Sequence, residues 1–133
     1  MQKLVLNPAS LAKPSGFSHG MLASGGRLLF LAGQTGLDAD GRITAPGDLV
    51  AQFRQVLANL QSVVAQAGGK LTDITQLRIF VTDKAAYRAN RKALGQVYRS
   101  FLGKHYPAMT LVEVKSLLDD DALVEIEGVA VID

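Results

Sequence analysis

The residues of this chain that are best suited to chemistry are carboxylates set within aliphatic runs. Glu113 lies in the run 111–114, and Glu125 and Glu127 lie in the run 123–132. Burial removes the hydration of a carboxylate, so a carboxylate in an apolar strand requires a compensating partner or a function. Desolvation also raises the pKa of a carboxyl group toward the range of a general acid or base. The alternative is a structural role, in which the carboxylate accepts backbone N–H hydrogen bonds.

The remaining polar candidates are two histidines, a glycine-rich turn and an acidic run. His19 and His105 are the only side chains whose ordinary pKa lies near neutral pH. Two distant histidines without cysteine are a poor ligand set, so no metal site is predicted. Residues 33–36 read Gly-Gln-Thr-Gly and offer backbone N–H groups to an oxyanion. The three carboxylates at 119–121 are typical of solvated charge on a turn.

The composition is that of one globular domain, residues 1–133. Hydrophobic residues make up 48% of the chain and charged residues 20%, and this length can bury a core without disulfides or metals. Cysteine is absent, which is compatible with a cytoplasmic location. No signal-peptide pattern and no apolar run of about 18 residues is found, so no membrane partner is predicted. The net charge of +2 is small and the basic residues are scattered, which disfavours a nucleic-acid partner.

Hydrophobic periodicity and turn residues predict an α+β fold. Helices are expected over residues 48–67 and 83–102, each begun by a capping aspartate. Gly25 and Gly26 predict a hairpin between the second and third strands. The last two strands are expected to face each other across the acidic turn. The predicted strands are residues 3–6, 21–24, 27–32, 74–82, 111–114 and 123–132.

Two helices with one apolar face each can cover only one side of such a sheet. The strands are nevertheless apolar on both faces, since nearly every residue of 111–114 and 123–132 that is not a carboxylate is aliphatic. An uncovered apolar sheet face requires a partner surface, and closed symmetry is the usual way to supply one. An obligate oligomer is therefore predicted, without a number of subunits.

The chain contains, in this order, the motifs FSHG at 17–20, AGQTG at 32–36, IFVTD at 79–83, VYRSFLGKHYPA at 97–108 and VEIEGVAV at 124–131. In these motifs and their order it resembles the Rid family, the reactive intermediate deaminases also called YjgF or endoribonuclease L-PSP proteins. The resemblance extends from about residue 17 to 131. It implies a chorismate-mutase-like (bacillus-type) fold, with a mixed sheet covered on one face by two helices. It also implies a homotrimer with a central β-barrel, three small-molecule clefts between subunits and no cofactor.

In the deaminase branch of the family, an arginine after a Pro-Ala pair binds the carboxylate of a 2-imino acid. A late glutamate and the Gly-Gln turn place the water that hydrolyses the imine to a keto acid and ammonia. The resemblance implies that Gly33 and Glu127 hold these positions here, with Glu127 as the catalytic group. Glu125 is interpreted as a rim or interface charge, and Glu113 as structural.

Three positions depart from that pattern, and each becomes apolar. Met109 follows Ala108 where the arginine is expected, and Phe17 and Ala32 replace a common tyrosine and serine. A thioether cannot pair with an anion, so the usual 2-imino acid is a poor substrate candidate and a less anionic one is expected. The predicted ligand-binding residues are therefore Phe17, Ala32, Gly33, Ala108 and Met109, with His19 and Arg78, a substitute cation, as further candidates.

Three functions are compatible with these residues. The first is an enzyme that hydrolytically deaminates an enamine, imine or related C=N compound. The second is a non-catalytic trimer that binds a metabolite or regulates a partner. The third is a ribonuclease, which is disfavoured because neither a catalytic histidine pair nor a concentrated basic patch is evident.

Overall fold

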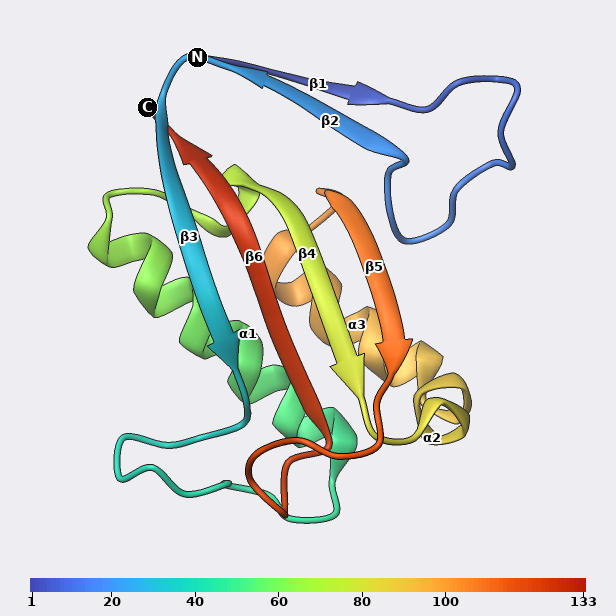
Figure 1. Cartoon of the computed structure of the whole chain (residues 1–133), viewed down its shortest axis with the longest axis vertical. Helices are drawn as coiled ribbons and strands as arrows, with labels where there is room; N and C mark the ends of the chain where they lie inside the picture. Colours follow the sequence, from blue (N-terminus) through green and yellow to red (C-terminus); the bar gives the residue numbers. More distant parts are fainter.

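The computed structural model describes residues 1–133 and confirms the α+β class. Both termini lie at one end of the molecule, where the N-terminal amine is 3.4 Å from Oδ1 of Asp133 (Figure 1). No helix is long and apolar enough to span a membrane. The elements in chain order are β1 (Gln2–Leu6), β2 (Gly20–Ser24), β3 (Arg27–Gln34), α1 (Leu49–Gln66), the 3-10 turn η1 (Leu71–Asp73), β4 (Ile74–Val81), α2 (Lys84–Ala89), α3 (Arg91–Leu102), β5 (Ala108–Glu113) and β6 (Val124–Ile132).

The main sheet has four strands in the order β3-β6-β4-β5 (Figure 1). β6 is antiparallel to both of its neighbours, whereas β4 and β5 are parallel. The expectation that the last two strands face each other is wrong, because β4 lies between them. β6 takes the centre because it is the more apolar strand: Val124, Ile126 and Ala130 are fully buried. β5 forms the edge, where most of its residues are exposed.

The predicted hairpin between the second and third strands is also wrong. β2 pairs with β1 in a separate two-stranded sheet, and β3 pairs with β6. Gly25 and Gly26 both have positive φ, so they turn the chain out of one sheet and into the other. A Cβ on Gly26 would lie 2.8 Å from the carbonyl oxygen of Ile132, so this position also requires the close backbone approach that glycine allows.

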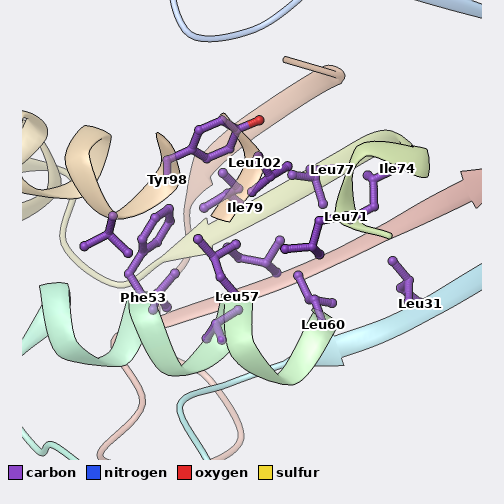
Figure 2. Packing of buried hydrophobic residues seen from close by; sticks show 14 of the residues in the cluster. Leu31, Phe53, Leu57, Leu60, Leu71, Ile74, Leu77, Ile79, Tyr98 and Leu102 are labelled. Atoms are coloured by element: carbon purple, nitrogen blue, oxygen red, sulfur yellow. The ribbon is translucent and has the colours of Figure 1, made fainter. Parts of the chain in front are cut away.

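Helix α1 forms where the sequence predicts it and supplies one side of the core. The Asp48 carboxylate accepts a hydrogen bond from the backbone N–H of Ala51 at 3.0 Å, which caps the first turn. The apolar residues that recur at helical spacing along α1 are buried except for Val63: Leu49, Phe53, Val56, Leu57, Leu60 and Val64. Figure 2 shows Phe53, Leu57 and Leu60 of this helix packed with residues of the sheet and of α3.

The second predicted helix is two helices that meet at Asn90. The Asn90 side chain donates a hydrogen bond to the carbonyl oxygen of Ala86 at 2.8 Å, and its backbone leaves the helical region with φ −107° and ψ 15°. Asparagine competes with helix hydrogen bonds through its side chain, which explains the break. α2 carries no buried residue, whereas α3 buries Leu94, Val97, Tyr98 and Leu102.

All three helices lie behind the main sheet, and its other face is uncovered, as predicted (Figure 1). Large apolar side chains are exposed on that face. Phe30 is 73% exposed, Leu28 is 65% exposed and Val112 is 41% exposed.

Candidate functional site

A cavity of about 600 Å³ lies between α2–α3 and the edge strand β5. The loop of Ser15, Gly16 and Phe17 contributes to its wall. Its volume falls within the range of small-molecule sites. Phe17 and Met109, two predicted ligand-binding residues, both line it.

Strand alternation explains which residues of β5 reach the cavity. Met109, Leu111 and Glu113 line it, whereas the intervening residues of β5, including Ala108, do not. Oε2 of Glu113 accepts a hydrogen bond from the backbone N–H of Lys84 at 2.8 Å. Glu113 thus satisfies one of the free N–H groups in the first turn of α2.

Aromatic residues form another part of the cavity wall. The rings of Tyr98 and Tyr106 are stacked, with centroids 5.4 Å apart and planes 4° apart. The Tyr98 hydroxyl donates to the carbonyl oxygen of His105 at 2.7 Å. Burial, reinforced by the neighbouring Tyr106 and Tyr87 hydroxyls, raises the pKa of Tyr98 far above its ordinary value. Tyr98 therefore stays neutral at physiological pH and offers no phenolate base.

Four basic side chains that are not among the predicted site residues line the same cavity. Lys84 and Arg88 come from α2, and Arg91 and Arg99 come from α3. None of them forms a salt bridge. Burial raises the pKa of Tyr87, and the positive charge of Arg91 acts in the opposite direction. If Gly95 is counted with them, these residues recur every three or four positions, with Gly95 between the last two. Such spacing places them on one helical face, and it is the sequence signal that could have identified them.

The predicted catalytic elements lie on the uncovered face of the main sheet. Glu125 and Glu127 share that face, as alternation predicts. Gly33 lies against Glu125, since a Cβ on Gly33 would be 2.5 Å from Oε1 of that carboxylate. Glu127 instead lies opposite Arg78 on β4, with Nη1 of Arg78 3.6 Å from its Oε1. Ala32, next to Gly33, is exposed.

The two groups of candidate residues do not meet within one chain. Phe17 and Met109 lie on the helix side of the sheet, and Glu125 and Glu127 lie on its uncovered face. Arg78 is on that second face and does not line the cavity. A site that contains both groups therefore requires a second copy of the chain.

The two histidines have backbone partners in separate places. Nε2 of His19 is 2.7 Å from the carbonyl oxygen of Ala12, and its ring meets Phe17 edge-on at 5.3 Å. Nε2 of His105 is 2.7 Å from the carbonyl oxygen of Ile74, and the residue is half-buried. His19 thus supports the Phe17 ring. No three histidine, aspartate or glutamate side chains lie close enough together to hold a metal ion.

Comparison with known proteins agrees with this architecture. The model of the family described as endoribonuclease L-PSP matches residues 8–132. A RutC family protein of Pyrococcus horikoshii is 32% identical over 128 residues, which are 96% of this chain and 97% of the relative.

Solved structures give the same result. YyfB of Yersinia pestis, a Rid family protein of unknown function, superimposes with a TM-score of 0.88 at 35% identity, covering 99% of this chain and 100% of the other. RidA of an Antarctic Psychrobacter superimposes with a TM-score of 0.68 at 27% identity, covering 91% and 92%. The family model, the curated relative and the solved structures therefore agree that this protein is a member of the Rid (YjgF, endoribonuclease L-PSP) family.

Proposed function

We propose that this protein is an enzyme that hydrolyses the C=N bond of a small imine, or of an enamine through its imine form, in a cleft between copies of the chain. Water adds to the imine carbon, and the tetrahedral adduct expels ammonia or an amine to leave a carbonyl compound. The contact between Gly33 and the Glu125 carboxylate is the observation that carries this proposal. It puts a proton acceptor beside exposed backbone, where a water could be oriented.

Glu125 is a better candidate than Glu127 for the general acid/base. Glu127 already has a partner, because Oε1 of its carboxylate lies 3.6 Å from Nη1 of Arg78. Glu125 forms no salt bridge and contacts Gly33. The sequence-based assignment of catalysis to Glu127 stays a prediction, which the two glutamine variants described in the Discussion distinguish.

A homotrimer is part of the proposal, because one chain separates Glu125 from the Phe17 and Met109 cavity. The exposed apolar face of Phe30 and Leu28 supports burial against further copies. In such an assembly the edge of one subunit, with its cavity, would lie beside the open sheet face of another. Native mass spectrometry tests the predicted trimer, and a stable monomer at micromolar concentration would contradict a cleft between subunits.

The decisive experiment measures ammonia release from freshly generated imines of alanine, leucine and an uncharged amine. Turnover that requires Glu125 supports the enzyme. A trimer that binds ligand but turns over none of these compounds supports the second candidate, a metabolite-binding or regulatory protein. Met109 favours that second candidate, because it removes the cation expected at this family position.

A further inference from the structure

The cavity between α2–α3 and β5 holds more positive charge than the whole chain. Its charged lining consists of four cations and one carboxylate, a formal net charge of +3, whereas the complete chain has +2. The only acid, Glu113, already accepts the N–H of Lys84. None of the four cations forms a salt bridge with an acidic side chain.

We propose that this cavity binds a small ligand with an aromatic or apolar body and a dianionic group, either a phosphate ester or a dicarboxylate, through Arg88, Arg91 and Arg99. The inference deepens the proposed function and rests on it in one respect, that the substrate lies in this cavity. It revises the expectation of a less anionic substrate. The missing arginine at position 109 is replaced here by cations from a different element.

The basic side chains of α2 and α3 are exposed and have no acidic partner on either helix. Residues 84–102 contain five basic residues and not one aspartate or glutamate. Surface helices gain stability from acid–base pairs three or four residues apart, and like charges at these spacings cost similar amounts. Lys84 and Arg88 have this unfavourable spacing and no compensating acid. An anionic ligand would relieve this repulsion.

Gly95 gives the cations room at the cavity. It lies within α3, where glycine is less favourable than alanine, and it occupies the position between Arg91 and Arg99 on the cavity side. A Cβ on Gly95 would lie 3.1 Å from Nη1 of Arg99. The Arg99 guanidinium therefore lies over the glycine, in the space that a side chain would take.

The number of guanidinium groups indicates a dianion. One arginine can bind both oxygens of a single carboxylate with two parallel hydrogen bonds, and each guanidinium carries five N–H donors. Three guanidinium groups suit the three oxygens of a phosphate ester or the four of two carboxylates. The remaining lining, which includes Phe17, Met109 and the stacked Tyr98 and Tyr106, suits a ring.

The test is titration calorimetry of the assembled protein with phenyl phosphate, phthalate, benzoate and benzyl alcohol. Phenyl phosphate or phthalate is expected to bind at least about tenfold more tightly than benzoate, with benzyl alcohol weakest. Which of the two dianions binds better identifies the group. Equal affinity for the dianions, benzoate and benzyl alcohol would overturn the proposal.

Three variants connect binding to the arginines. The double change Arg91→Gln and Arg99→Gln is expected to weaken the dianion at least about tenfold, while Lys92→Gln, on the same helix but outside the cavity, keeps it within about twofold. Gly95→Ala is expected to hold or raise the melting temperature and still weaken binding, because it displaces Arg99. Equal losses in the double variant and Lys92→Gln would overturn the proposal.

Two further outcomes keep the inference separate from the proposed function. Ammonia release whose KM is unchanged by the double arginine variant would overturn the anion subsite and leave the enzyme intact. Arginine-dependent binding of phenyl phosphate without turnover of any imine would uphold the subsite and defeat the enzyme. Arginine-dependent binding of a single-stranded RNA oligonucleotide that phenyl phosphate does not displace would overturn the small-molecule assignment in favour of a nucleic-acid surface.

Discussion

Gly33 and Glu125 approach so closely that a Cβ at position 33 would stand 2.5 Å from Oε1 of the carboxylate. The glycine thus fixes where the carboxylate lies on the uncovered face of the sheet. Any larger residue at this position would push the carboxylate away. A substitution at Gly33 or Glu125 is therefore expected to lower the proposed hydrolytic activity more than the stability of the fold.

Glu125→Gln is expected to lower ammonia release by about 10²- to 10⁴-fold, the usual contribution of a general acid/base. Glu127→Gln, on the same strand and face, is the matched control and is expected to cost less than about tenfold, since it removes the partner of Arg78. Initial rates with the imine of leucine measure both. A larger loss in Glu127→Gln would return the catalytic role to Glu127.

Met109→Arg is expected to raise kcat/KM for imino acids by at least about tenfold, because it adds a guanidinium to the cavity wall. Met109→Leu keeps the volume without the charge and is expected to change kcat/KM by less than about threefold. Rates with the imines of alanine and leucine measure the effect. No gain in the arginine variant would show that position 109 does not set specificity.

Phe30→Glu is expected to dissociate the oligomer, because it places a charge on the exposed apolar face of the sheet. Val63→Glu is the control, since Val63 is exposed on α1, on the other side of the molecule. Native mass spectrometry at several protein concentrations measures the subunit number. An unchanged oligomer in Phe30→Glu would remove this face from the interface.

Gly128→Ala is expected to lower the free energy of unfolding by about 2 kcal/mol or more, because its Cβ would collide with the backbone carbonyl of Gln76. Gly20→Ala is the control: its Cβ would make only an ordinary 3.6 Å contact with Leu6, so a change below about 0.5 kcal/mol is expected. Urea unfolding measures both. Equal stability of the two variants would contradict the tight β4–β6 approach.

Asp73 is expected to make stability depend on pH in the acid range. Burial raises its pKa, but the hydrogen bonds and charges of Lys3 and Lys70 outweigh burial and hold the pKa below its ordinary value of 3.8. Its stabilisation is complete above that ordinary value and is lost as pH falls through the lower folded pKa. Asp73→Asn should therefore be less stable than the wild type at pH 7, and the difference should shrink at pH 3 in urea unfolding. A difference independent of pH would contradict the shift.

Local features of the fold could be predicted from the sequence, and long-range pairings could not. The capped, periodic stripe of α1 and the β-branched run of β4 carry their own signals. Gly25 and Gly26 indicate a turn, but the neighbouring residues do not determine whether β2 pairs with β3 across that turn or with a strand of another sheet. That choice depends on β6, about a hundred residues away.

The candidate site was predictable in part for the same reason. Alternation put Glu125 and Glu127 on one face, but only the register opposite Arg78 and Gly33 distinguishes them. Met109 and Phe17 were expected in one cavity, and they line it. The cavity's basic residues share one face of the predicted helix 83–102, but their spacing alone does not show that this face lies beside β5.

The central position of β6 has a consequence for the order of folding during synthesis on the ribosome. Its two partners, β3 and β4, are synthesised before it and are not neighbours of each other in the folded sheet. Until residues Val124–Ile132 emerge, both strands expose unpaired edges, and α1 lacks part of its packing surface. Folding therefore waits for the last strand, and the nascent chain is most open to aggregation and to chaperone binding just before that strand appears.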